Sequence, residues 1–263
     1  MISIVYCYIL NNIIQVNEVA VNTIEYAQME KMESTYWWHV GRLRIIEREC
    51  ERHLFGMDNV KILNIGCGTG GTVDTLQKFG EVHNVDVSDE ALGFMKRKGY
   101  KNLYKVSGIK LPFPDNTFDA VGAFDVLEHI ELDKEALREW RRVLKPGGKL
   151  LITVPAYQWL WSQHDTSLHH FRRYTKMNLW RKLEDESLEI RRISYAIVFS
   201  FPLVAGFRIL KSLSRGEVTE HTSYVAMPKI INELFIKLLQ VESWAHRWVN
   251  FPFGTSVLAV SEK

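Results

Sequence analysis

Short apolar runs recur along the middle of the chain, and each is followed by polar or glycine-rich residues. The runs that are rich in β-branched or aromatic residues and have the length of buried strands occupy residues 60–65, 82–87, 102–106, 118–124 and 149–154. Two segments between them, 88–96 and 133–143, place apolar residues three or four positions apart, as an amphipathic helix does. Strands that alternate with helices predict a parallel sheet with helices on both faces.

The last third of the chain adds two strands and an insertion between them. Residues 188–195 and 255–260 have strand-like patterns. A long amphipathic helix is predicted from Pro228, and its broad apolar stripe consists of Ile230, Ile231, Leu234, Phe235, Leu238, Val241 and Trp244. The insertion, residues 196–250, is interpreted either as a helical hairpin packed on the domain or as an apolar foot that reaches a lipid surface. A homodimer contact is a third interpretation.

Helices are also predicted ahead of the first strand. Residues 22–25 have the pattern of a capping box, which would begin a helix running toward residue 39, and residues 42–54 carry a helical apolar stripe. We therefore expect an N-terminal helical extension over residues 1–57 and a main domain over 58–263. The extension either covers the sheet or brings Trp38 and Arg42 over a ligand. The second alternative is based on the paired aromatic residues beside an arginine, which packing against a sheet does not require.

Length and charge narrow the class of protein. A chain of 263 residues predicts one α/β domain with additions. Lys and Arg number 33 against 31 Asp and Glu, a net charge of +2, so no nucleic-acid partner is expected. Between residues 138 and 192, however, twelve basic residues face six acidic ones. This local surplus predicts either a solvated basic face or a surface for an anionic substrate or an acidic membrane.

Cysteine usage predicts a cytoplasmic protein. The insertion at residues 196–250 adds the alternative of a peripheral membrane contact. Cys7, Cys50 and Cys67 are too few and too scattered for a disulfide framework. The apolar start, residues 1–10, has no basic region before it and stops at Asn11, so neither a secretion signal nor a membrane span is expected there.

The junction between the first strand and the following helix predicts a nucleotide-type site. Glycines follow the strand directly, and Asp86 ends the next strand, twenty positions after Gly66. Glycine lets the backbone approach a ligand, the helix N-terminus offers N–H groups, and a carboxylate at this spacing can accept hydrogen bonds from both ribose hydroxyls. Gly66, Gly68 and Gly71 fit the dinucleotide pattern G-x-G-x-x-G, whereas Gly70 completes the G-x-G-x-G turn of S-adenosylmethionine enzymes. This segment alone leaves the nucleoside open.

A second group of candidate residues follows the fifth strand, between residues 159 and 174. It contains Trp159, Trp161, His164, Asp165, His169, His170, Phe171, Arg172, Arg173 and Tyr174. We interpret this segment as the wall of an acceptor pocket, although an exposed polar loop would have a similar composition. His164 or His170 could take a proton from a hydroxyl, and Arg172 or Arg173 could bind a carboxylate or phosphate. The three histidines lack a further ligand at suitable spacing, so no metal site is predicted.

Several motifs in order carry a resemblance to a known family. They are LNIGCGTG at 63–70, VDVS at 85–88, LPFPDNTFD at 111–119, VLEH at 126–129 and RVLKPGG at 142–148. Together they resemble the successive motifs of class I S-adenosylmethionine-dependent methyltransferases of the type 11 group. The likeness is strong over residues 58–156. It extends more loosely, through Trp37, Trp38 and later aromatic segments, to a bacterial and archaeal group often linked with surface glycan or lipid genes.

The resemblance implies a seven-stranded Rossmann-like sheet, mostly parallel with an antiparallel last strand, and S-adenosylmethionine as cofactor. By this likeness, the cofactor-binding residues are Gly66, Cys67, Gly68, Thr69, Gly70, Asp86, Val87, Val126 and His129. The glycines would lie against the methionine portion, Asp86 would hold the ribose and Val87 would touch adenine. Ser107 replaces an Asp common in the family, so adenine recognition is expected from backbone at Gly108 and Ile109. Glu128 is expected to cap a helix or pair structurally.

These observations predict a methyltransferase that acts on an oxygen of a saccharide, a lipid-linked molecule or a small-molecule acceptor. The catalytic candidates are His170, His164, Arg172 and Tyr174. Two alternatives remain open at this stage. One is a nicotinamide-dependent oxidoreductase, based on Gly71, and the other is a non-catalytic module that binds the cofactor and regulates a partner.

Overall fold

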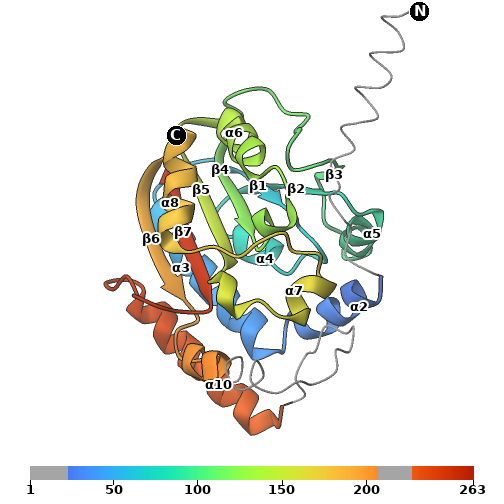
Figure 1. The fold of residues 1–263 in the computed structure, drawn as a ribbon. Coiled ribbons are helices and arrows are strands. Elements are labelled where there is room, and N and C mark those ends of the chain that lie inside the picture. Colours follow the sequence, from blue (N-terminus) through green and yellow to red (C-terminus); the bar gives the residue numbers. More distant parts are fainter. Residues whose placement is uncertain (1–22, 207–226) are drawn as a thin grey trace, which may run out of the picture.

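Seven strands form the central sheet of the computed structural model, which describes residues 23–206 and 227–263 (Figure 1). They are β1 Lys61–Ile65, β2 Glu81–Asp86, β3 Leu103–Lys105, β4 Phe118–Phe124, β5 Leu144–Pro155, β6 Glu189–Ala196 and β7 Ser256–Glu262. Their order is β3-β2-β1-β4-β5-β7-β6, and β7 runs antiparallel to both neighbours. The predicted doubly wound sheet with an antiparallel last strand is confirmed. The apolar start of the chain lies outside the described residues.

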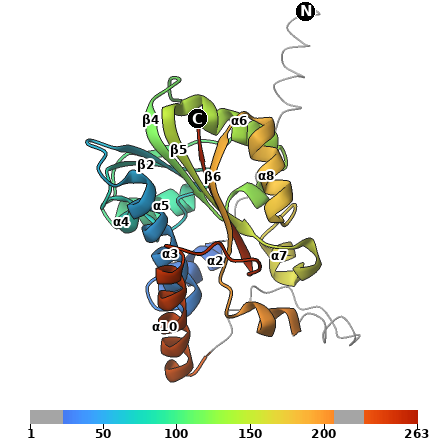
Figure 2. The same ribbon diagram turned by 90° about the vertical axis from the view of Figure 1, so that its left-hand side faces the viewer.

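Helices cover both faces of the sheet. They are α2 Thr23–Met32, α3 Trp37–Leu54, α4 Val73–Leu76, α5 Asp89–Arg97, α6 Asp133–Val143, α7 Gln163–Ser167, α8 Lys176–Asp185 and α10 Lys229–Ala245, with single turns η1 Leu127–His129 and η2 Gln158–Leu160. Figure 2 shows α6 and α8 on one face and α3, α4 and α5 on the other. In the described part of the chain, no helix has both the length and the apolar character needed to cross a bilayer.

Two predicted boundaries were wrong. The helix expected to run from residue 22 toward residue 39 ends at Met32, and a new helix begins at Trp37. The Thr35 hydroxyl donates to the Lys31 carbonyl, so a side chain competes for a backbone acceptor where the helix stops. The fifth strand begins at Leu144 and not at residue 149. Residues 144–148 form an irregular first stretch of this strand, with Gly147 at φ +79°.

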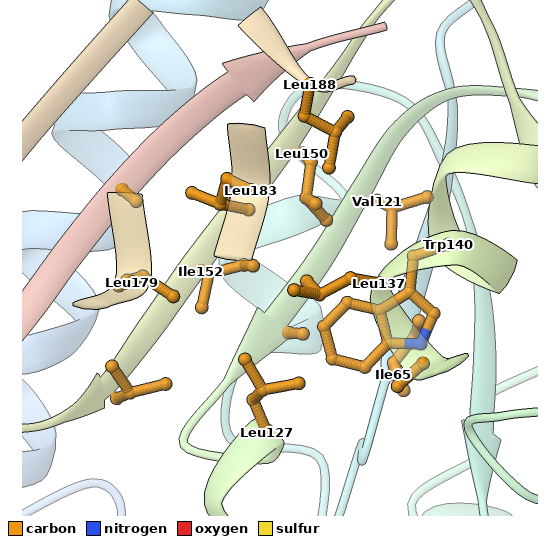
Figure 3. Close-up of a cluster of buried hydrophobic side chains, with 14 of the residues drawn as sticks. Ile65, Val121, Leu127, Leu137, Trp140, Leu150, Ile152, Leu179, Leu183 and Leu188 are labelled. Atoms are coloured by element: carbon orange, nitrogen blue, oxygen red, sulfur yellow. The ribbon is translucent and has the colours of Figure 1, made fainter. Parts of the chain in front are cut away.

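The main hydrophobic core lies between the sheet and helices α6 and α8 (Figure 3). Trp140 of α6 is fully buried there, among leucines of the strands and of α8. Its indole Nε1 donates to the Gly108 carbonyl at 2.7 Å, which satisfies its polar atom. The core therefore also holds the loop after β3 against the sheet.

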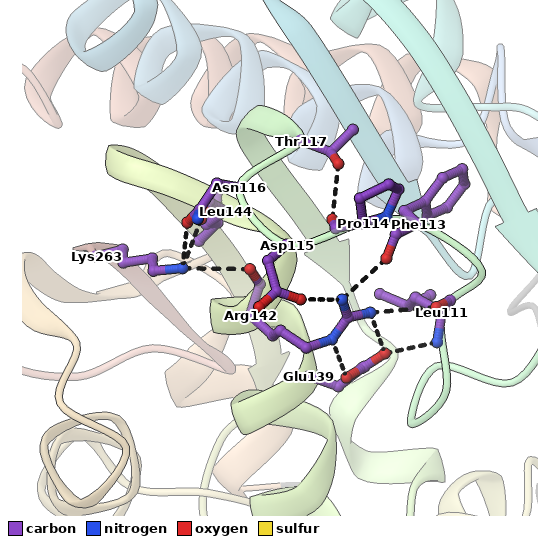
Figure 4. Close-up of polar contacts among 10 residues, drawn as sticks. All are labelled: Leu111, Phe113, Pro114, Asp115, Asn116, Thr117, Glu139, Arg142, Leu144 and Lys263. Carbon is purple, nitrogen blue, oxygen red and sulfur yellow. Dashed lines mark hydrogen bonds and ion pairs between the residues drawn. The ribbon is translucent and has the colours of Figure 1, made fainter.

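Two of the sequence motifs meet at the amino end of β4 (Figure 4). Arg142 donates to the Leu111 and Phe113 carbonyls and pairs with Asp115 and Glu139. Glu139 in turn accepts from the Leu111 backbone N–H at 2.8 Å. The LPFPDNTFD and RVLKPGG segments therefore form one hydrogen-bonded unit, at the end of β4 opposite to the expected cofactor edge.

Helix α10 packs on α3, but most of its apolar stripe faces away from the protein. The side chains that α10 buries include Leu239, Glu242 and Ser243. Most of the predicted stripe is exposed instead, as are two residues that follow the helix: Ile230, Ile231, Leu234, Leu238, Val241, Trp244, Trp248 and Val249. We call this set the α10 outer face.

Candidate functional site

The loops that follow β1 and β4 lie side by side where the strand order reverses, the usual ligand position in such sheets. A Cβ added to Gly66 would stand 2.4 Å from Cγ2 of Val126, so the two loops touch. Gly66, Gly68 and Gly70 have φ values of +65°, +52° and +97°. Gly71 is not among the residues with positive φ. The backbone therefore uses the glycines of the G-x-G-x-G turn, because only glycine adopts this region without strain.

Asp86 lies at the carboxyl end of β2, beside this turn. Its side chain is buried, and its two oxygens accept the backbone N–H groups of Gly68 and Ser88, each at 2.9 Å. Burial raises the pKa of Asp86, although these backbone hydrogen bonds favour the charged form. A carboxylate oxygen has two lone pairs, so each oxygen can still accept one hydrogen bond from a ribose hydroxyl.

Helix α2 covers the glycine turn and Asp86, a contact that sequence patterns did not reveal. Tyr26 is buried beside Asp86 and shares a hydrogen bond with the Ser88 side chain, and burial raises the pKa of this phenol. The Thr69 hydroxyl donates to Glu33 at 2.8 Å. No periodic or motif signal distinguishes Tyr26 and Glu33 in the sequence, because their role depends on where α2 packs.

Arg42 of α3 reaches the carboxyl end of β4. Its guanidinium pairs with Asp125, donates to the Phe124 carbonyl at 3.3 Å and lies over the Trp38 ring at 4.8 Å. Asp125 has φ +57°, an uncommon backbone conformation for a residue other than glycine. The structure therefore brings Trp38 and Arg42 to the site edge, where Arg42 holds the Asp125 side chain.

The loop after β3 supplies the remaining residues of the expected cofactor site. The Ser107 hydroxyl accepts the Ile109 backbone N–H at 3.2 Å, and the Gly108 carbonyl is taken by Trp140. Val87 is half-buried, directly after Asp86. Cys67 is buried within the glycine turn, and burial raises the pKa of its thiol well above the ordinary value.

Glu128, in the turn η1 after β4, is almost completely buried at 1% exposure. Among the described residues, neither of its carboxylate oxygens has a hydrogen-bond partner. Burial, together with the neighbouring Asp125, raises the pKa of Glu128 well above its ordinary value. The expected capping or pairing role of this residue was wrong.

His129 and His170 lie beside Glu128, with their rings edge to face at 4.5 Å between centroids. His170 Nδ1 lies 3.0 Å from Asp165. Arg173 binds the same carboxylate with Nε at 2.6 Å and a terminal nitrogen at 2.9 Å. Burial alone would raise the pKa of Asp165, but His170 and Arg173 outweigh it and hold that pKa well below its usual range. Burial lowers the pKa of His129 to about 3.

The other predicted catalytic residues lie elsewhere or have internal partners. His164 is exposed on α7. Arg172 pairs with Asp133 at 2.8 Å and donates to the Glu131 carbonyl. Tyr174 is 1% exposed in the main core, and its hydroxyl donates to Asp133 at 3.1 Å. Of the four predicted catalytic side chains, the structure therefore brings only His170 to the edge next to the glycine turn.

Comparisons with known proteins identify a methyltransferase domain in this chain. A sequence model of a methyltransferase domain family matches residues 63–152. A sterol 24-C-methyltransferase of Gibberella zeae is 36% identical over 110 residues, which are 38% of this chain and 28% of that enzyme. A demethylmenaquinone methyltransferase of Corynebacterium urealyticum is 33% identical over 114 residues, which are 43% of this chain and 49% of that enzyme. The chain therefore spans less than half the length of these relatives.

Among solved structures, the fold resembles a putative methyltransferase of Haloferax volcanii, in complex with the Trm112 methyltransferase activator. The TM-score is 0.58 at 16% identity, covering 91% of this chain and 94% of that one. The matched methyltransferase domain covers about a third of this chain, and the fold around it is the Rossmann-like fold of methyltransferases. Residues 63–152 carry the methyltransferase domain itself, and the methyl donor that the family implies is S-adenosylmethionine.

The residues present fit this cofactor. The left-handed backbone of Gly66, Gly68 and Gly70 makes a close approach possible, and a Cβ at Gly68 would meet only the Met29 sulfur, at 3.6 Å. Asp86 retains lone pairs for ribose hydroxyls. These four residues are the ones that would hold the nucleoside and the methionine portion.

Proposed function

We propose that this chain transfers a methyl group from S-adenosylmethionine to an oxygen of an acceptor, with a lipid-linked molecule favoured over a free saccharide or another small molecule. The observation that carries the methyl-transfer proposal is the pairing of the Gly66–Gly70 turn with the buried Asp86 carboxylate. It accounts for nucleoside binding, because the backbone at Gly68 has room for a ligand and the Asp86 oxygens keep lone pairs for ribose hydroxyls.

The bound cofactor would supply an electrophilic methyl group. The protein has to hold the acceptor oxygen in line with that methyl group and accept its proton, while the electrons of the broken carbon–sulfur bond stay on sulfur. Positioning of this kind contributes on the order of 7–11 kcal/mol in favourable cases. Val126 touches the glycine turn, and His129 follows in the same segment, so we place the acceptor beside His129 and His170.

His170 is the proposed proton acceptor. Because Nδ1 faces the Asp165 carboxylate, that nitrogen carries the hydrogen and Nε2 keeps the lone pair. Asp165 itself is held by Arg173 and by the Ser162 backbone N–H at 2.8 Å.

The basic residues at 138–192 support no polyanionic acceptor, because many of them pair with carboxylates of the protein. These residues are Arg138, Arg142, Lys145, Lys149, Arg172, Arg173, Lys182, Arg191 and Arg192.

The α10 outer face supports a lipid-linked acceptor. Exposed Ile, Leu and Trp side chains in one stripe are costly in water and bind membrane interfaces. The similarity to sterol and demethylmenaquinone methyltransferases, whose names state apolar acceptors, points in the same direction. We therefore place the protein at a membrane surface, with α10 against the lipid.

The proposal is tested first by calorimetry with S-adenosylhomocysteine and with NAD⁺ on the same sample. Binding of the homocysteine product alone supports methyl transfer, whereas binding of NAD⁺ alone would replace it with the oxidoreductase alternative. Transfer of a tritiated methyl group into solvent-extracted lipids is measured next. Label only in water-soluble products would overturn the lipid-linked acceptor and leave the methyltransferase in place. Binding without any transfer would support the regulatory alternative.

A further inference from the structure

Three potential metal ligands converge next to the glycine turn. Glu128 and His129 come from the turn after β4, and His170 comes from the segment after α7. Each offers one ligand atom, and these atoms all lie within 4.8 Å of one another. Ligands at about 2.1 Å from one ion are separated by roughly 3–4 Å, so a small side-chain adjustment would bring all three into coordination range.

The Glu128 carboxylate has no hydrogen-bonding partner in the part of the chain that the structure describes. The residue is 1% exposed, and both of its oxygens lack hydrogen bonds. A charged carboxylate that is buried without a partner lowers the stability of the folded protein. A bound cation or a proton would offset this loss. The nearby guanidinium groups of Arg42 and Arg173 favour the charged carboxylate electrostatically, but each forms its ion pair with another residue, Asp125 or Asp165.

Both histidines have their second ring nitrogen engaged by an oxygen acceptor. His170 Nδ1 faces the Asp165 carboxylate at 3.0 Å. The His129 ring forms a hydrogen bond with the Leu168 backbone carbonyl. Such contacts set the tautomer and leave the opposite nitrogen with a lone pair, which is the usual arrangement around metal-binding histidines.

We propose that Glu128, His129 and His170 bind a divalent first-row transition-metal ion. Two imidazoles and one carboxylate suit zinc, iron, cobalt or manganese better than magnesium or calcium, which prefer oxygen ligands. Three protein ligands leave coordination positions open. Asp165 would act as a positioning residue, because it orients the His170 ring.

The site would lie beside the proposed acceptor position, since Val126 contacts Gly66 and is only two residues from Glu128. A metal ion there would lower the pKa of a bound hydroxyl, as bound cations do. The proton of that hydroxyl would pass to solvent water, because His170, as a metal ligand, could no longer accept it. The metal site does not depend on methyl transfer, because metal binding is measured without cofactor or acceptor.

Cobalt(II) is the probe, because its visible absorption reports on coordination. The full chain, stripped with a chelator, is titrated with CoCl₂, and the variants Glu128→Gln and His170→Asn are titrated in parallel. His169→Asn is the matched control. It removes the neighbouring exposed histidine, and asparagine tolerates the backbone at φ +56°. Thermal melting of each metal-free protein shows whether the variants are folded.

We expect one cobalt ion per chain, with affinity reduced at least about tenfold in Glu128→Gln and His170→Asn and unchanged in His169→Asn. Two outcomes would overturn the proposal. One is the absence of a visible band and of binding heat in the wild-type protein. The other is cobalt binding that survives both substitutions in folded protein, which would mean that Glu128 is buried as the neutral acid.

Discussion

Gly41 of α3 lies directly beneath Leu239 of α10. A Cβ placed on Gly41 would stand 1.9 Å from the Leu239 Cδ1 and 2.7 Å from its Cβ. Leu239 is fully buried, and the Cβ is close to the α10 backbone, so a side-chain rotation does not remove the clash. The insertion is therefore held to the N-terminal helices by a contact that requires glycine in α3.

Replacing Gly41 with alanine should therefore destabilise the protein. Forcing extra atoms into a packed contact typically costs about 1–3 kcal/mol, which outweighs the gain of about 0.5–1 kcal/mol in helix propensity. Gly93 of α5 is the matched control, because a Cβ there would meet only Arg97, at 3.6 Å. Urea unfolding should show a loss for Gly41→Ala and a small gain for Gly93→Ala. Equal effects in the two variants would mean that α10 does not pack here.

Substituting Asp86 with asparagine should weaken binding of S-adenosylhomocysteine about 10- to 100-fold. Hydrogen bonds to a charged group contribute about 1.5–3 kcal/mol, and the amide presents one acceptor oxygen in place of two. Asp89→Asn removes a charge three positions away, on a 76% exposed side chain that pairs with Lys105. Calorimetry should show unchanged affinity for Asp89→Asn. An unchanged affinity in Asp86→Asn would exclude Asp86 from the cofactor site.

His39 should make the protein less stable in acid. Burial, aided by Arg42, lowers the pKa of His39 from 6.5 to about 3. Between these values the unfolded chain binds a proton at this position and the folded protein does not, so the free energy of unfolding decreases as the pH falls from 6.5 toward 3. His39→Gln should reduce this slope by up to about 1.4 kcal/mol per pH unit. Urea unfolding at pH 7, 6, 5 and 4 measures it, and identical slopes would contradict the expectation.

Membrane contact through the α10 outer face predicts that Trp244 and Trp248 matter for lipid binding and little for folding. They are 56% and 64% exposed. The double variant Trp244→Ser, Trp248→Ser should lose flotation with liposomes while its melting temperature stays close to that of the wild type. Trp159→Ser, which removes a 53% exposed indole elsewhere, is the control and should still float. If the double variant floats as well, or if gel filtration shows that the substitution splits a dimer, the face is not a membrane surface.

The sequence places Trp244 in the predicted apolar stripe but does not distinguish it from Phe235, which packs on the protein. Helical periodicity groups Phe235 with the exposed residues of α10, yet the Phe235 ring packs on Trp37 at 5.3 Å between centroids and on Phe199 at 5.0 Å. Periodicity shows that a helix has an apolar stripe, but it does not show which neighbour covers which part. Phe235→Glu should therefore disturb packing and is unsuitable as a test of lipid binding.

The sequence by itself determined the sheet, the glycine turn and Asp86. These features depend on neighbours close along the chain, where apolar runs, glycines and a carboxylate at fixed spacing have few alternative arrangements. Only the tertiary structure decided that α2 covers Asp86, that Tyr174 belongs to the core, and that Glu128 meets His129 and His170. Glu128 and His170 are 42 positions apart in the sequence, and packing of whole elements places them together. Local sequence patterns do not show which distant residues become neighbours in space. The spacing of the histidines alone therefore argued against a metal site.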